Sequence, residues 1–365
     1  MGRYLNPGME SFEKSVNSEI YVDKTGLVGY TNRVMNTVQG YVCVSRPRRF
    51  GKSMAANMLT AYYSRGCDSR EIFSKFEISE SPDFEKYRNK YNTIFLNMQE
   101  FLSRSDSVEA LVDRVKKLVL RDLKREYPDV DYFDDTDLVE SMQDIYETEK
   151  CPFVVIIDEW DCIFREFRQN KEAQEKYLDF LRDLLKDKAC IHLAYMTGIL
   201  PIKKYGTHSA LNMFDEFSMI NPGPLAPYVG FTEVEVEYLC HKYRMDMEEV
   251  KAWYDGYSFS MAASVYSPRS VVNSMLFGKI ENYWNQTETF EALQVYIDMN
   301  FEGLKDDVLS MIAGERIPVN TGSFTNDMTT FRTEDDVLTL LIHLGYLAYD
   351  SENKVVKIPN NEVRN

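Results

Sequence analysis

The fold expected for this chain follows from one stretch, Ser45-Arg46-Pro47-Arg48-Arg49-Phe50-Gly51-Lys52-Ser53. The preceding residues 41–44 are aromatic or β-branched around one cysteine, which favours a buried strand, and residues 54–63 contain no Pro or Gly, which favours a helix. A strand, Gly-Lys-Ser and a helix in this order are the context of a phosphate-binding loop. In such a loop, backbone amides bind phosphate oxygens, Lys52 neutralises the β and γ phosphates of a nucleotide, and the Ser53 hydroxyl binds Mg²⁺.

One position departs from the usual loop pattern. Arg46 stands where the pattern has Gly, so the loop must begin in a conformation open to a residue with Cβ, and Pro47 fixes φ just after it. A chance Gly-Lys-Ser at a helix start is the alternative, but the strand and helix on either side favour a phosphate site. Residues 41–66 hold five cations and no carboxylate. The residues predicted to bind the nucleotide are Arg46, Pro47, Arg48, Arg49, Phe50, Gly51, Lys52, Ser53 and Met54.

A second motif lies at residues 153–159, Phe-Val-Val-Ile-Ile-Asp-Glu. Its apolar residues predict a strand buried on both faces of a parallel sheet, with Asp158 and Glu159 at the carboxyl end, where ligands bind in open α/β sheets. Asp158 is predicted to hold the Mg²⁺ shell through water, and Glu159 to polarise the water that attacks the γ-phosphate. A later strand ends at Thr197, which is either a γ-phosphate sensor or a simple hydrogen-bond partner at a strand end.

Composition limits the function classes. The chain has 365 residues, 44% of them hydrophobic, which favours two domains. The net charge of -16 argues against a surface built to coat nucleic acid. The six cysteines and four histidines are dispersed and lack metal-ligand spacing, so buried thiols in a reducing compartment are expected. No apolar run is long enough to span a membrane and no signal peptide is visible, so a cytoplasmic protein is predicted.

Strands and helices alternate over the first part of the chain and predict a parallel, doubly wound α/β sheet. We expect a strand-like pair at 21–22 and a helix over 27–35 before the phosphate loop. Residues 221–227 are the densest Pro/Gly cluster, and domains over 1–228 and 229–365 are predicted. The other expected strands are 93–98, 190–197 and an edge strand within 213–219, and the expected helices are 108–127 and 170–187.

The remainder is expected to be mainly helical and similar to a lid or winged helix. Thr232 and Glu235 form a capping box that begins a helix running through residue 243. A shorter helix is expected to end at 253–257, and a third to follow Pro268 after a strand-like run at 265–267. Further helices are expected over 291–313 and 334–345, and a hairpin is expected between 346–349 and 355–358.

These motifs together resemble the family of predicted AAA-ATPase-like proteins that often precede a PD-(D/E)XK nuclease-like domain. The resemblance covers essentially the whole chain and accounts for Arg46, since Arg is normal there in the family. It implies a P-loop NTPase of the additional-strand class, with ATP as the nucleotide and a winged-helix-like C-terminal part. The segments that carry it are residues 21–25, 45–53, 158–159, 197–198, 231–232, 253–257 and 359–364.

The resemblance also raises the question of nuclease chemistry. In the family the final motif leads into the nuclease-like domain, whereas this sequence ends at Asn365. Glu352-Asn353-Lys354 fits the Glu-x-Lys element of such nucleases and Asp350 lies nearby, but a metal site needs an acidic residue on a separate strand. We expect these residues to form a solvated turn, and no nuclease activity is predicted for this chain.

Three functions remain open from the sequence. The first is Mg-dependent ATP hydrolysis that drives an attached or partner effector, nuclease-like by resemblance. The second is a regulatory switch that hydrolyses ATP slowly or not at all, and the third, ranked low because acidic residues outnumber basic ones, is DNA binding after residue 229. An arginine from a neighbouring subunit is one source for the cation that hydrolysis needs. The candidates in cis are Arg48, Arg49, Arg165 and Arg168.

Overall fold

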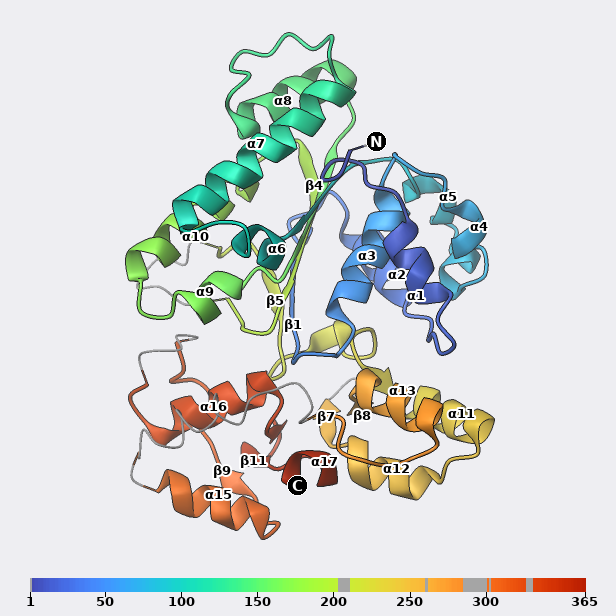
Figure 1. The fold of residues 1–365 in the computed structure, drawn as a ribbon, viewed down its shortest axis with the longest axis vertical. Coiled ribbons are helices and arrows are strands. Elements are labelled where there is room, and N and C mark those ends of the chain that lie inside the picture. The colour runs from blue at the N-terminus through green and yellow to red at the C-terminus, as the bar shows by residue number, and fades with distance from the viewer. Residues whose placement is uncertain (1, 203–210, 260–261, 285–300, 302, 326–330) are drawn as a thin grey trace. The chain divides into compact units, whose positions relative to one another are not determined.

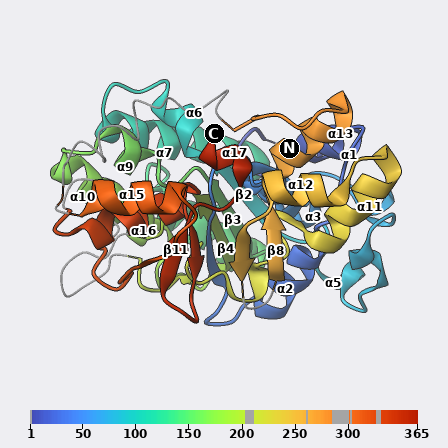
Figure 2. The same ribbon diagram turned by 90° about the horizontal axis from the view of Figure 1, so that it is seen from below.

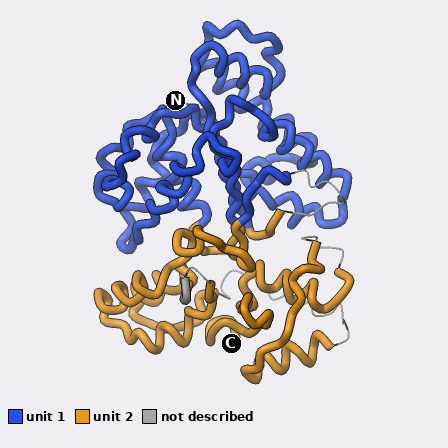
Figure 3. The backbone as a smooth tube through the Cα atoms, turned by 180° about the vertical axis from the view of Figure 1, so that it is seen from behind, with its two compact units in different colours: residues 1–44, 52–198, 204–216 blue, residues 45–51, 199–203, 217–365 orange. Residues whose placement is uncertain are grey.

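The computed structural model describes residues 2–202, 211–259, 262–284, 301, 303–325 and 331–365 (Figure 1). The chain divides into two compact units (Figure 3). The first comprises Met1–Val44, Lys52–Gly198 and Lys204–Glu216, and the second Ser45–Gly51, Ile199–Lys203 and Phe217–Asn365. Part of the phosphate loop therefore belongs to the second unit. The domain boundary expected after residue 228 stays a prediction.

The first unit is built on a five-stranded parallel sheet, which confirms the predicted fold class. Its strand order is β2-β3-β4-β1-β5, so β4 lies between the strand before the phosphate loop and the strand that ends in Asp158. This order is the additional-strand arrangement expected from the family resemblance. The strands are β1 (Tyr41–Ser45), β2 (Asn92–Asn97), β3 (Phe153–Asp158), β4 (Ile191–Gly198) and β5 (Asp215–Phe217).

Helices cover both faces of this sheet, as Figures 1 and 2 show: α1 and α3 lie on one side, and α7, α9 and α10 on the other. Every residue of β3 is buried, which explains its unbroken apolar sequence. The helices of the first unit are α1 (Glu10–Val16), α2 (Gly26–Val34), α3 (Lys52–Tyr63), α4 (Arg70–Phe73), α5 (Phe84–Tyr87), α6 (Met98–Leu102), α7 (Val108–Glu126), α8 (Leu138–Glu149), α9 (Cys162–Glu166) and α10 (Lys171–Leu185), with a 3₁₀ turn at Glu77–Glu80.

The segment before α2 differs from the expectation. Residues 21–22 form no strand, because Asp23 holds the chain in a turn: its side chain accepts hydrogen bonds from the backbone of Thr25 at 2.8 Å and of Glu77 at 2.8 Å. An earlier segment covers the free edge of the sheet instead, since Leu5 forms an antiparallel bridge with Ile94 of β2. Covering the edge strand protects its unpaired backbone groups.

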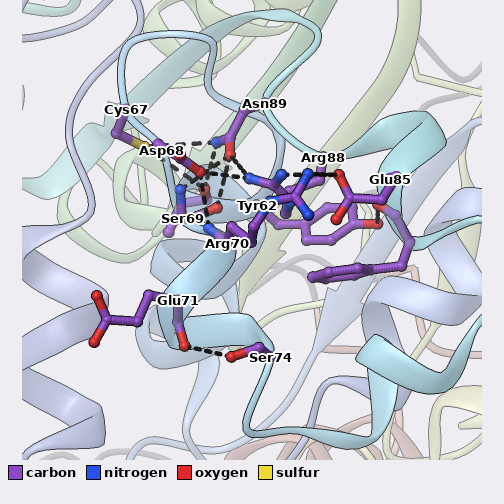
Figure 4. A network of polar contacts seen from close by, with 12 residues as sticks. Tyr62, Cys67, Asp68, Ser69, Arg70, Glu71, Ser74, Glu85, Arg88 and Asn89 are labelled. Carbon is purple, nitrogen blue, oxygen red and sulfur yellow. Dashed lines mark hydrogen bonds and ion pairs between the residues drawn. The ribbon is translucent and has the colours of Figure 1, made fainter.

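A buried arginine fixes the segment after α3 (Figure 4). The Arg88 side chain is only 7% exposed and donates to Asp68 at 2.8 Å and to Glu85 at 2.9 Å. It also donates to the Asn89 side chain at 2.6 Å, and the Asn89 amide donates to the Ser64 carbonyl at 2.7 Å. This network ties the polar segment to the end of α3 and pairs the charge of a guanidinium that would be costly to bury alone.

The second unit contains helices and two small antiparallel sheets, ordered β6-β8-β7 and β10-β11-β9. The predicted capping box is present, since the Thr232 amide donates to the Glu235 side chain at 2.7 Å, and so is the hairpin near the end of the chain. The likeness to a winged helix stays a prediction. The strands are β6 (Phe231–Thr232), β7 (Tyr257–Phe259), β8 (Ala262–Tyr266), β9 (Ile317–Pro318), β10 (Ala348–Asp350) and β11 (Val355–Lys357).

The helices of this unit agree with most of the sequence-based expectations. Of the helix expected over 291–313, only the end is seen, because residues 291–300 and 302 lie outside the described residues. The hairpin tip is an exposed turn, in which Asp350 accepts from the backbone of Glu352 at 3.0 Å and of Asn353 at 3.1 Å. The helices are α11 (Glu233–Tyr243), α12 (Met247–Tyr254), α13 (Pro268–Phe277), α15 (Leu304–Ile312), α16 (Glu334–Leu344) and α17 (Asn361–Arg364), with a 3₁₀ turn at Gly223–Leu225.

Candidate nucleotide-binding site

Three polar side chains lie in one row across the carboxyl ends of neighbouring strands. Asn97 of β2 pairs in register with Asp158 of β3, which pairs with Thr197 of β4. Parallel strands bring their carboxyl ends to the same edge of the sheet, where open α/β proteins bind ligands. Asp158 and Thr197 are buried there, at 1% and 0% exposure.

The first residues of α3 lie beside this row. Gly51 has φ of +89°, a conformation that favours glycine, and the helix begins directly after it with Lys52 and Ser53. The Ser53 hydroxyl lies beside the Asp158 carboxylate and acts to lower its pKa. The structure thus brings together the loop hydroxyl and the strand carboxylate that the sequence predicted as Mg²⁺ ligands.

Lys52 is a buried cation among carboxylates. Burial lowers the pKa of Lys52, while the charges of Glu159, Asp161 and Asp158 act in the opposite direction. A lysine at this position can neutralise phosphate charge when a nucleotide brings further negative groups to it. Its predicted role at the β and γ phosphates stays a prediction.

Burial also raises the pKa of Asp158, to about 6, although the Ser53 hydroxyl and the Glu159 backbone amide favour the ionised form. The Glu159 amide donates to Asp158 Oδ1 at 3.0 Å, and Asn97 Nδ2 lies 3.4 Å from Oδ2. Asn97 was not predicted as a site residue. The signal in the sequence is the position of Asn97 at the carboxyl end of β2, the strand before β3 in the chain.

Glu159 follows Asp158 in a left-handed backbone conformation, with φ of +54°. Its side chain is 22% exposed and accepts a hydrogen bond from Arg165 Nη2 at 2.5 Å. Arg165 was predicted only as one of four candidate cations for hydrolysis. The fully buried Asp161 on the other side of this arginine, at 3.4 Å from its Nε, was not predicted as a site residue.

Thr197 donates its hydroxyl hydrogen to the Val44 carbonyl of β1 at 3.0 Å. This bond joins two neighbouring strands and matches the simpler of the two functions expected for Thr197. A hydroxyl has one hydrogen to donate, so sensing a γ-phosphate would require this bond to break. The sensor function therefore stays a prediction.

The arginines of the loop make contacts within the second unit. Arg46 is fully buried, and its Nη1 donates to the carbonyls of Ser45 at 2.9 Å and Phe217 at 3.0 Å. Arg49 has φ of +69° and donates to the Tyr283 carbonyl at 2.8 Å. These two guanidinium groups contact backbone oxygens, whereas the Arg48 side chain is exposed.

The apolar residues of the loop also pack within the second unit. The Phe50 ring is fully buried, with its centroid 5.4 Å from that of Tyr257 and 6.5 Å from that of Trp284. Pro47 lies against Gly345, where a Cβ would approach the proline ring to 2.7 Å. The Tyr257 hydroxyl donates to the Gly345 carbonyl at 2.5 Å. Met54, on the first turn of α3, is 43% exposed.

Glu362 connects several of these contacts. Its side chain is 1% exposed and accepts hydrogen bonds from the backbone of Tyr283 at 2.8 Å and of Trp284 at 3.0 Å. The Ser270 hydroxyl and the charge of Arg49 act to lower the pKa of Glu362, but burial dominates and raises it. The sequence marked this residue through the family motif without predicting its role.

The oxygen donors at Ser53 and Asp158 fit Mg²⁺, which binds hard oxygen ligands and usually keeps only one or two protein carboxylates. No cluster of three or more His, Cys, Asp or Glu side chains able to hold a metal occurs among the residues that the structure describes. A metal at this place would therefore need the nucleotide phosphates and water to complete its shell. Magnesium binding stays a prediction.

A five-stranded sheet of this order, with Gly-Lys-Ser at the start of α3 and Asp-Glu at the end of β3, defines a P-loop NTPase of the additional-strand class. Residues 6–207 match the family described as predicted AAA-ATPase. The chain belongs to this family. Membership and fold together support nucleotide binding.

Relatives and solved structures were also found. An uncharacterized protein encoded in the vnfD 5′ region of Azotobacter chroococcum mcd 1 is 25% identical over 298 residues, which cover 77% of this chain and 54% of that protein. This chain thus spans about half the length of that relative. The Walker-type ATPase of Pyrococcus abyssi is 14% identical, with a TM-score of 0.45 and 93% of each chain covered. The ORC2 protein of Aeropyrum pernix, solved in ADPNP-ADP complexes, is 13% identical, with a TM-score of 0.38 and coverage of 94% and 92%.

The described helices include none that combines the length and the apolar character needed to cross a membrane. No disulfide joins any of the six cysteines, all of which lie in described segments. The predicted cytoplasmic location is not tested by these observations.

Proposed function

We propose that this chain binds and hydrolyses Mg-ATP. The observation that carries the proposal is that Lys52 and Ser53 begin α3 beside the carboxylates of Asp158 and Glu159, with the Lys52 side chain buried among them. The four side chains come from the loop-helix and strand motifs that P-loop NTPases use for phosphate, metal and water. ATP is favoured over GTP by the family to which the chain belongs.

In the proposed mechanism, backbone amides of residues 46–53 bind the phosphates and Lys52 neutralises their charge. Ser53 and Asp158 would hold Mg²⁺, which offsets the charge that develops on the phosphate oxygens. Glu159 orients a water molecule and accepts its proton as the water oxygen bonds to the γ-phosphorus. The bond from that phosphorus to the β,γ-bridging oxygen breaks, and ADP and phosphate are the products.

We further propose that the nucleotide state drives or gates an effector. The effector is an attached or partner domain, and a nuclease-like domain is the one suggested by the family resemblance of the sequence. The loop arginines Arg46 and Arg49 contact backbone carbonyls of the second unit, which supports a link between the phosphate loop and the folding of that unit. Self-association that supplies a cation in trans belongs to the same proposal.

A nucleotide-dependent switch with little hydrolysis is the second candidate. It is favoured by the ion pair between Glu159 and Arg165, because the carboxylate oxygen bonded to the guanidinium is not available to an attacking water. The two candidates agree on ATP binding and differ in turnover. A rate measurement therefore separates them.

The test compares wild type with Lys52→Ala and Glu159→Gln, and measures Mg-ATP affinity and turnover in the same samples. Lys52→Ala is expected to weaken ATP binding by about 10-fold or more, since it removes a charge-assisted contact. Glu159→Gln is expected to keep the affinity within about 3-fold and to lower turnover by about 100-fold, the range of general-base catalysis. Lys176→Ala, which changes an exposed lysine of α10, is the matched control and should behave as wild type.

Unchanged ATP affinity in Lys52→Ala would contradict the binding site. Wild-type protein that binds ATP without measurable turnover would contradict hydrolysis and favour the switch. Turnover that survives in Glu159→Gln would show that another group orients the water.

A further inference from the structure

One guanidinium joins two carboxylates directly after β3. Arg165, on the short helix α9, donates from Nη2 to Glu159 Oε2 at 2.5 Å, and its Nε lies 3.4 Å from Asp161 Oδ2. Arg165 therefore lies between a carboxylate predicted to be catalytic and a second one with no assigned function.

The two ends of this arrangement differ in burial. Asp161 is 0% exposed, Arg165 is 10% exposed and Glu159 is 22% exposed. Asp161 has little room to move, because a Cβ added at Gly198 of β4 would lie 2.6 Å from its Oδ1. Charges at such depth are only weakly screened by solvent. Asp161 is thus the fixed end, and Glu159 is the end that a water molecule can reach.

The backbone of this segment is fixed independently of the ion pairs. Glu159 has φ of +54°, and its carbonyl accepts from the Cys162 amide at 3.1 Å. The next residue, Trp160, donates its amide to the Thr197 carbonyl at 3.2 Å. The backbone contacts place the Glu159 Cα, and the direction of the side chain then depends on Arg165.

We propose that Arg165 is a positioning residue for Glu159, held in place by Asp161. Within the described residues, the hydrogen bonds of the Glu159 carboxylate use Oε2 alone, so Oε1 remains for the attacking water. The inference rests on the proposed hydrolysis and assigns it a residue that acts through Glu159. This function differs from that of an arginine that contacts the phosphates directly, because a direct contact would raise the rate of hydrolysis even without the Glu159 carboxylate.

The test measures kcat and KM for Mg-ATP in the full chain for Arg165→Gln, Arg165→Lys, Glu159→Gln and the double variant Glu159→Gln/Arg165→Gln. Arg165→Gln is expected to lower kcat by about 10- to 100-fold, as misplacement of a catalytic group does, with KM changed by less than about 3-fold. Arg165→Lys should recover part of kcat, because a lysine keeps the charge but not the two-sided geometry. In the Glu159→Gln background, Arg165→Gln should change the residual rate by less than about 2-fold, since residues that act as one unit are not additive.

Two controls keep the result interpretable. Arg182→Gln, which removes an exposed arginine paired with Asp179 on α10, should leave kcat unchanged. If Arg165→Gln does not fold, as judged by urea unfolding, Asp161→Asn tests the other end of the same arrangement. It should lower kcat in the presence of Glu159 and not in Glu159→Gln.

Unchanged kcat in Arg165→Gln would overturn the inference while leaving the proposed ATPase intact. A further loss in the double variant comparable to that in the single variant would also overturn it and identify a direct contact with the phosphates. A raised KM with normal kcat would assign Arg165 to binding instead. Wild-type protein without turnover would refute the proposed hydrolysis itself and this inference with it.

Discussion

Removal of the Glu362 carboxylate should destabilise the second unit. Glu362 is 1% exposed and accepts hydrogen bonds from two backbone amides, those of Tyr283 and Trp284. Glu362→Ala leaves both amides without this acceptor, and each buried orphan donor costs about 1–3 kcal/mol. Since water can enter the space that the side chain leaves, we expect a loss of about 3 kcal/mol in the free energy of unfolding.

Glu362→Gln separates the hydrogen bonds from the charge. The glutamine side chain has nearly the same shape and retains one oxygen that can accept from the two amides. It removes a buried charge, whose desolvation is unfavourable, together with its attraction to Arg49. These effects oppose each other, so the loss expected for Glu362→Gln is about 1 kcal/mol or less.

The assay is urea unfolding followed by tryptophan fluorescence, since Trp284 is a partner of Glu362 and packs against Phe50. A loss of about 3 kcal/mol corresponds to a fall of about 6–12 °C in the melting temperature of a unit of this size. Glu352→Ala, at the exposed hairpin tip, is the matched control and should unfold as wild type. An unfolding midpoint in Glu362→Ala equal to that of Glu352→Ala would refute the assignment of Glu362 as a structural acceptor.

Two further predictions concern buried groups. Thr197→Val removes the hydroxyl that donates to the Val44 carbonyl, and we expect it to lower the free energy of unfolding in urea by about 1–2 kcal/mol. If this variant is less stable but has a normal kcat, Thr197 is not a γ-phosphate sensor. The second concerns pH: because the pKa of Glu362 is raised above its ordinary 4.5, the native state binds more protons than the unfolded state between that value and the raised pKa. The stability of wild type relative to Glu362→Gln should therefore fall as pH rises through this window and become constant above it. A constant difference between the urea midpoints of the two proteins over a pH series would contradict this prediction.

The parts of the fold that could be predicted are those encoded by local patterns. The apolar run before Asp158 is a strand because both of its faces are buried, and Thr232 and Glu235 begin a helix because they satisfy its first amides. Such signals need only neighbours in sequence. The run at 21–22 misled for the same reason, since its conformation depends on the distant bond from the Glu77 amide to Asp23.

The same difference between local patterns and distant contacts applies to the site residues. The sequence predicts functions for Lys52, Ser53, Asp158 and Glu159 because their motifs carry the chemistry in a few adjacent positions. Arg165 remained one of four candidate cations, since no spacing rule selects among them. The function proposed for Arg165 depends on its distances to Glu159 and Asp161, which the sequence does not give.

The unusual residues of the phosphate loop can now be explained by packing. The loop pattern has Gly where this chain has Arg46, and a phosphate ligand is the obvious interpretation of an arginine there. The guanidinium donates to the carbonyls of Ser45 and Phe217 and lies over the Phe259 ring, with 5.5 Å between the Arg46 Cζ and the ring centroid. A buried cation with these contacts supports the backbone from which the loop starts, since carbonyl oxygens near a loop need donors when water is excluded.

The side chains of Arg49 and Phe50 also pack within the second unit. The Arg49 guanidinium donates to the Tyr283 carbonyl, and the buried Phe50 ring packs against Tyr257 and Trp284. Glycines at these positions would leave the loop free to adopt many conformations. Phosphate binding would then cost the conformational entropy of the free loop. The side chains of the second unit therefore restrict the loop before any nucleotide arrives, so this Arg-rich variant of the phosphate loop depends on a folded second unit for its shape.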